Sequence, residues 1–540
     1  MCAFRNCRIH WVHKWPFTIT PSLHYSSLPG IALAALLLAA GCASPPERPA
    51  DVSEAARPRQ IQTPEAGFPD LAVADGLTLE QAVWMALQQN QDLIVQGYEP
   101  LTAGAFIARE RGRFSPELFA AISHRDSRST ETARATGEQF GAEVEQTLIE
   151  AGVRRDFVTG TDVELSLQQV SESSNRSPDQ NEARIGLSLT QALLQGRDRV
   201  ANLAAVRQAE LGLAVSTAQL RGFTESVVAE VEGAYWRYWL ATETISIAEQ
   251  ALDVAEQQLA DVRQRIAVGQ LARNEEAVAQ AEAARRRQVL IDARADEVRR
   301  RIELLQSIAP GHPATGYLLA PVTLPELPDV DADDSPAIRI RLAEQSRADL
   351  SEARLRLEQQ RLDTVVTRDG LLPRLDFFAQ LAKSGYGADP VDTWSGLDDD
   401  SYDVRVGLRF SRTLGERTEA ALHEAARFRH DQAAAAVENL RLYIGSRVLI
   451  AINELERARQ QVEASAETRR LQALTVESEV ERFRVGTGTA LMVAQAQRDL
   501  LASMIEEQRA RVQARLALLQ LYQAEGSLLD RRGILPAFEE

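Results

Sequence analysis

A long internal duplication limits the fold of this chain more than any other feature of its sequence. The first copy contains Ala86, Gln88, Asp92, Leu93 and Pro116, and the second contains Ala343, Gln345, Asp349, Leu350 and Pro373, each 257 positions later. Solenoid repeats have periods of about 20–50 residues. The duplication therefore predicts two large related units rather than a repeat array.

Three further blocks recur in the same order. The segment 184–187 returns at 405–408, the segment 265–269 at 482–486, and the segment 278–281 at 493–496, with shifts of 221, 217 and 215. The fall from 257 to 221 leaves 36 more residues between the proline and the Arg-[Ile/Val]-Gly-Leu block of the first copy. An additional β-hairpin would account for them.

Each copy predicts a helix, strands, a very long helix, a tight turn and a returning helix. The long helices span about residues 197–268 and 416–485. About 70 residues at 1.5 Å per residue extend about 105 Å, too long for one globular domain. The low aromatic content of 6% agrees with long helices. The expected fold class is mainly α with a transmembrane β part, built on duplicated antiparallel coiled-coil hairpins.

The long helices carry apolar or small residues at alternating steps of three and four, as coiled coils do. In the first hairpin the outgoing stripe is Ile245, Ala248, Leu252, Ala255, Leu259, Val262, Ile266 and Gly269. Its expected return stripe is Ala277, Ala281, Ala284, Gln288, Ile291, Ala295, Val298, Ile302 and Leu305. The second outgoing stripe is Val448, Ile452, Leu455, Val462, Ala466, Ala473, Val476, Val480 and Phe483.

Each hairpin ends in a turn that contains glycine. Val268 and Gly269 stand at the first turn, and Val485, Gly486 and Gly488 stand at the second. Glycine is favoured where a helix must stop and reverse. These residues are the predicted hairpin tips.

Between the helices, period-two stretches at 162–167, 184–189 and 403–410 predict strands with one apolar face. This pattern fits either a half-buried sheet or a lipid-facing barrel. The long helices are expected to pack on one another, which leaves no helical layer to cover the strands. We therefore expect a barrel whose outer face is covered by lipid.

The N-terminus predicts export and a lipid anchor. An apolar run from Ile31 to Ala40 follows basic residues and leads into Gly41-Cys42; a run of about ten is too short to span a bilayer and is typical of a signal peptide. The segment 38–42 resembles a lipobox, with Cys42 as the lipidated residue, although the usual Leu lies one place too far upstream. A plain signal peptide with a chance Cys is the alternative. A single remaining Cys cannot form an internal disulfide.

These features divide the chain into six parts. They are a signal peptide (1–41), a Pro-rich tether (42–76), the first repeat (77–308), a Pro-rich acidic linker (309–335), the second repeat (336–529) and a tail (530–540).

Several function classes lack the residues they need. A net charge of −17 argues against a nucleic-acid surface. The four His of the expected mature chain, His124, His312, His423 and His430, show no metal-binding spacing. No phosphate-binding loop, nucleophile motif or Cys pair is present. We therefore expect no enzyme activity, no metal and no cofactor.

The assembled pattern resembles the TolC-like outer-membrane efflux proteins from about Leu77 to Leu529. The strings 79–83, 186–194 and 483–490 look like phrases of that family. The resemblance implies a homotrimer with a shared β-barrel in outer-membrane lipid and a periplasmic helical tunnel. It also implies a periplasmic adaptor and an inner-membrane pump as partners. Docking of the adaptor is implied at the tips, Val268, Gly269, Val485, Gly486 and Gly488, where helix reversal alone is the alternative role. Ala43 after Cys42 implies sorting to the outer membrane.

Two departures from the family pattern stand out. Many relatives have Asp where this chain has Met492, and the 36 additional residues exceed the usual two strands per repeat. Two other functions stay open, a periplasmic adaptor and a structural coiled-coil envelope lipoprotein without a pore. Paired strand blocks and two collinear hairpins favour the passive outer-membrane duct over both.

Overall fold

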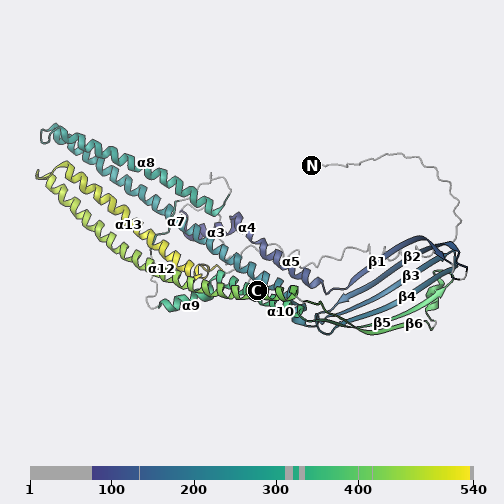
Figure 1. Ribbon diagram of the computed structural model, residues 1–540. Helices are drawn as coiled ribbons and strands as arrows, with labels where there is room; N and C mark the ends of the chain where they lie inside the picture. Colours follow the sequence, from purple (N-terminus) through teal and green to yellow (C-terminus); the bar gives the residue numbers. More distant parts are fainter. Residues whose placement is uncertain are drawn as a thin grey trace, which may run out of the picture.

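The computed structural model describes residues 76–534, except 133, 135, 311–319, 327–334, 399 and 416. The expected signal peptide, the anchor residue Cys42 and nearly all of the tether lie outside the described residues, as do most of the linker and the end of the tail. The described chain is elongated, with a β-sheet at one end and two helical hairpins that extend to the other end (Figure 1).

In the first half of the chain, helices come before and after four consecutive strands. The elements are α3 (Leu79–Gln89), α4 (Gln91–Gln96), α5 (Tyr98–Gly112), β1 (Glu117–Thr132), β2 (Gln139–Asp156), β3 (Thr161–Ser174), β4 (Ser177–Ala192), α6 (Arg199–Asn202), α7 (Ala204–Ala267) and α8 (Asn274–Ile308). A capping box starts α3, in which Gln81 N donates to Thr78 Oγ1 (3.2 Å) and Thr78 N to Gln81 Oε1 (2.9 Å).

The second half follows the same order with two strands. Its elements are α9 (Pro336–Ser346), α10 (Ala348–Gly370), β5 (Arg374–Gly387), α11 (Asp392–Ser395), the 3₁₀ helix η1 (Gly396–Asp398), β6 (Tyr402–Ser411), α12 (Arg417–Arg484), α13 (Ala490–Glu525) and α14 (Leu528–Arg531). The expected fold class is confirmed, because long antiparallel helix pairs and an antiparallel sheet make up the described chain.

All six strands form one antiparallel sheet in the order β1-β2-β3-β4-β5-β6. The pairing of β4 with β5 joins the two halves of the chain. The Arg-[Ile/Val]-Gly-Leu blocks lie in β4 and β6, and the first half has two strands more than the second. These are the additional hairpin expected from the 36 extra residues, and β2 through β3, residues 139–174, also number 36.

The two faces of the sheet differ in chemistry. One row of paired residues crosses all six strands on one face: Leu118, Val153, Leu165, Leu187, Leu381 and Val404. We call it the apolar row. The polar row on the other face is Glu117, Arg154, Glu164, Ser188, Gln380 and Arg405. Each member of the apolar row is at least 41% exposed in the single chain, so this sheet has no apolar core of its own.

The helices supply the core instead. One cluster packs α3, α7 and α8 around Tyr235 and Trp236, which are fully buried and meet edge to face at 5.3 Å. A second cluster joins α9, α12 and α13 around Ile444 and Val448. The described part of the linker also packs here, since Tyr235 donates to the Leu77 carbonyl (2.8 Å) and accepts from Thr323 N (3.0 Å). Burial of these large side chains stabilises the centre of the molecule.

Two of the three predicted coiled-coil stripes are confirmed. Ala248, Ala255 and Val262 on α7 are buried at steps of seven, with Leu252 and Leu259 half-buried between them. On α12 every predicted position from Val448 to Phe483 is buried or half-buried.

The stripe predicted on the return helix α8 is wrong. Apart from half-buried Ile302 and Leu305, its positions are exposed, with Ile291 at 65% and Val298 at 41%. The buried side of α8 carries Ala279, Glu282, Ala283, Arg286, Leu290, Ala293, Leu304 and Ile308. Alanine occurs on both sides of this helix, and a charged pair occupies two of the buried positions. A search for apolar residues therefore selects the wrong side.

Among the helices of the described chain, none combines the length and the apolar character needed to cross a bilayer.

Candidate functional site

The two hairpin tips have nearly the same backbone geometry. Gly269 and Gly486 adopt positive φ angles of 78° and 82°, the left-handed region that favours glycine. Gly269 N donates to the Ile266 carbonyl (3.0 Å) and Gly486 N to the Phe483 carbonyl (3.2 Å), which closes each last turn. Val268 and Val485 are 65% and 70% exposed. Each tip therefore presents an apolar side chain on a hydrogen-bonded glycine turn.

The structure brings both tips to the same end of the molecule, far from the sheet (Figure 1). Just behind them Val262, Ala279, Phe483, Ala490 and Val493 form one buried cluster with contributions from both hairpins. The Arg265 guanidinium lies 5.4 Å from the centre of the Phe483 ring. The third glycine, Gly488, follows in the second tip, where its N donates to the Arg482 carbonyl (2.9 Å).

A charged link joins the hairpins further from the tips. Glu282 on α8 accepts from Arg498 on α13 at 2.9 Å and also pairs with Arg286 at 2.8 Å. The Glu282 and Arg286 side chains are only 8% and 5% exposed. Burial lowers the pKa of Arg286, and the Glu282 carboxylate opposes that effect. The two hairpins are thus held together by both apolar and ionic contacts.

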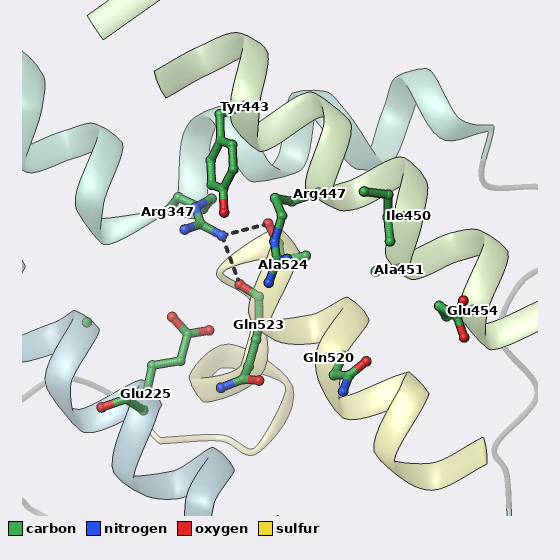
Figure 2. A pocket seen from close by; sticks show the side chains of 12 residues that line it. Glu225, Arg347, Tyr443, Arg447, Ile450, Ala451, Glu454, Gln520, Gln523 and Ala524 are labelled. Atoms are coloured by element: carbon green, nitrogen blue, oxygen red, sulfur yellow. Dashed lines mark hydrogen bonds between the residues drawn. The ribbon is translucent and has the colours of Figure 1, made fainter. Parts of the chain in front are cut away.

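A polar pocket of about 560 Å³ lies between α7, α12, α13 and the junction of α9 with α10 (Figure 2). Glu225, Arg347, Tyr443, Arg447 and Gln523 are among its lining residues. The Arg347 guanidinium donates to the carbonyls of Gln523 (3.3 Å) and Ala524 (3.2 Å) at the end of α13. Burial raises the pKa of Glu225 to about 7.

Sequence reasoning missed this pocket. Its residues come from three helices and the α9–α10 junction, and from positions as far apart as 225 and 523. No short spacing links them, so no motif could have revealed them. Charges of both signs and open access give the pocket the character of a solvated space between helices.

Aromatic rings cover glycines on the polar face of the sheet. A Cβ on Gly152 would lie 2.5 Å from the Phe119 ring, and one on Gly407 would lie 2.7 Å from the Phe378 ring. Arg154 and Arg409 lie over these rings at 5.9 and 5.4 Å. The polar face therefore exposes arginine rather than bare phenylalanine.

Within the described residues, no three His, Cys, Asp or Glu side chains are grouped so that they could hold a metal ion. The anchor residue Cys42 lies outside the described residues.

Known proteins match this chain in sequence and in fold. The family model of outer membrane efflux proteins matches residues 340–527. Comparison with curated protein sequences gives no significant match. The fold is similar to the outer-membrane channel OprN (17% identity, TM-score 0.62), with 83% of this chain and 90% of that chain covered.

Two further outer-membrane proteins have a similar fold. CmeC of Campylobacter jejuni has 16% identity and a TM-score of 0.60, with 83% of this chain and 85% of that chain covered. VceC of Vibrio cholerae has 17% identity and a TM-score of 0.59, with 83% and 96% covered. At such identities these structures establish the fold. The chain therefore has the fold of outer-membrane channels, and its residues 340–527 are similar in sequence to the outer membrane efflux proteins.

Proposed function

We propose that this chain is one subunit of a homotrimeric duct that lets solutes leave passively through the outer membrane. The observation that carries the proposal is the uncovered apolar row at the end opposite the hairpin tips. Lipid would cover this row in a closed barrel shared by three chains, and the polar row would then face water. The 64 residues of α7 extend about 95 Å from there toward the periplasm.

The proposed partners are a periplasmic adaptor, which docks at the tips, and an inner-membrane pump. The proposal is supported by the exposed Val268 and Val485 on hydrogen-bonded turns at one end of the molecule. Exposed apolar side chains on a rigid element are suited to anchoring a partner. In this proposal the pump supplies the energy for export.

Cys42 is the proposed lipid anchor, which holds the tether in the inner leaflet of the outer membrane. Its test is mass spectrometry of the purified protein from its own host. A lipid-modified N-terminal Cys42, lost in Cys42→Ser, would support the anchor. A free Cys42, or a chain cut elsewhere, would refute it.

Conductance of the purified protein in a planar bilayer, paired with native mass, tests the duct. We expect trimers with discrete openings. A monomer that never conducts would favour the adaptor, and a non-conducting oligomer would favour the structural spacer.

A photo-reactive residue at Val485 tests docking in living cells. We expect it to crosslink to a periplasmic protein with one helical hairpin and β-rich flanks, identified by mass spectrometry. The matched control is the same residue at Val366 on α10, which is 42% exposed and lies far from the tips. Equal crosslinking of one protein at both positions would refute docking at the tips.

A further inference from the structure

The outer strands of the sheet, β1 and β6, each have one unpaired edge within the described chain. An unpaired edge presents a row of free N–H and C=O groups and readily pairs with another strand. The edge of β6 is also strongly apolar on one face, where Val406, Leu408 and Phe410 are at least 60% exposed. Such an edge needs a partner strand in lipid, where no water can satisfy the backbone groups.

A second copy of this chain fits these edges. An even number of antiparallel strands makes β1 and β6 run in opposite directions, so β6 of one copy meets β1 of the next in antiparallel pairing. The apolar row ends in Leu118 on β1 and Val404 on β6, so the apolar face continues from copy to copy. Near the helical end of the sheet the polar face carries Glu117 on the β1 edge and Arg409 on the β6 edge, and further along it carries Arg125 on β1 and Asp403 on β6.

We propose that β1 pairs with β6 of a neighbouring copy and that three copies of the six-stranded sheet close a barrel of 18 strands. This inference rests on the proposed trimeric duct. Two strands per repeat would give 12 strands from three copies. At a strand spacing of about 4.8 Å and a tilt of about 40°, 18 strands give a backbone diameter of about 36 Å, compared with about 24 Å for 12. The barrel is thus about 1.5 times as wide.

The additional width comes from one insertion, the β2–β3 hairpin at residues 139–174. The register of the strands indicates that β1 and β4 could pair directly if this hairpin were absent. Leu118 on β1 lies in the same row as Leu187 on β4, and Phe119 lies in the same row as Gly186. Without the hairpin, β1 would meet β4 with the apolar row intact and with a glycine again opposite Phe119. The insertion therefore sets the width of the pore without changing its surface chemistry.

Electron cryo-microscopy of the full-length trimer in lipid nanodiscs is the direct test. We expect 18 strands in cross-section, and 12 strands in the variant that lacks residues 139–174, with its perimeter smaller by a factor of about 1.5. A full-length trimer with 12 strands, and one hairpin outside the ring, would overturn the wide barrel but leave the duct in place. A monomer without a ring would refute the duct as well.

Disulfide crosslinking tests the paired edges. Ala120→Cys on β1 is combined in turn with Val404→Cys, Val406→Cys and Leu408→Cys on β6. At least one pair is expected to give covalent dimers and trimers on oxidation, because adjacent strands bring Cα atoms within about 6 Å. Leu165→Cys with Val406→Cys is the control, because β3 lies inside the sheet. Crosslinked oligomers from the control, or from none of the edge pairs, would overturn the proposed pairing.

Discussion

Arg339 on α9 and Glu525 at the end of α13 form an ion pair of 2.5 Å in which both side chains are buried. Glu525 also accepts from Ser527 Oγ at 3.0 Å. The first and last long elements of the second half are therefore joined by a pair that water cannot reach.

Replacing one partner of this pair is expected to destabilise the protein strongly. Arg339→Ala leaves a carboxylate with 0% side-chain exposure without its shortest partner, and Arg531 at 3.4 Å remains; loss of one partner of a buried pair costs up to about 3–5 kcal/mol. Thermal loss of helical circular dichroism measures the effect. Arg361→Ala, which breaks an exposed pair with Glu358, is the control and should leave the midpoint unchanged. Equal midpoints for the two variants would contradict the prediction.

Because of Glu225, we expect the free energy of unfolding to depend on pH. Its pKa is raised from 4.5 to about 7 by burial, so the folded chain keeps a proton that the unfolded chain loses. Stability from this group is therefore present below pH 4.5, falls as the pH rises to about 7, and stays lower above that. Glu225→Gln should melt later than the wild type at pH 8 and close to it at pH 4.5. If the melting midpoints of the variant and the wild type differ by the same amount at both pH values, Glu225 is not the source of the pH dependence.

Gly385 on β5 holds the loop between β5 and β6 against the sheet. A Cβ at Gly385 would lie 2.1 Å from the Thr393 carbonyl oxygen, and fully buried Thr393 donates to Gln169 Oε1 at 3.2 Å. We expect Gly385→Ala to displace the loop and loosen its backbone, so that chymotrypsin can cleave after Trp394, at a cost of about 1–3 kcal/mol. Gly141→Ala on β2 has open space around it and is the control. Resistance of both variants to cleavage would show that the loop is held elsewhere.

Substitution of a tip glycine is expected to destabilise the tip and to leave the stability of the whole protein unchanged. Alanine at Gly269 or Gly486 must adopt a left-handed φ, which costs about 1 kcal/mol. Hydrogen exchange within four residues of each tip should become faster while the melting midpoint stays the same. Gly370→Ala in α10 has open space and an ordinary φ and should slow local exchange, because alanine favours helix. Faster exchange in all three variants would contradict this account.

Much of the fold could be predicted from periodicity. The steps of three and four predicted the α7 and α12 stripes, and the change of shift from 257 to 221 predicted the additional hairpin. These features repeat along the chain, so local pattern is enough to find them.

Contacts between distant segments could not be predicted in this way. Arg339 meets Glu525 over 186 positions, and Glu282 meets Arg498 over 216. Charged residues are usually placed on a solvated face, yet here they occupy buried positions in pairs. Charged residues also occupy buried positions on α8, which is why the stripe predicted from apolar residues lies on the wrong side of that helix.

The order of the sheet has a consequence for how such a chain changes over evolutionary time. Both α5 and α7 meet the sheet at the same end, because an even number of strands lies between them. Losing or gaining a single strand would send α7 out of the opposite side of the membrane. Strand number can therefore change in viable descendants only by pairs, and gene segments that encode one complete hairpin are the unit that selection can add or remove.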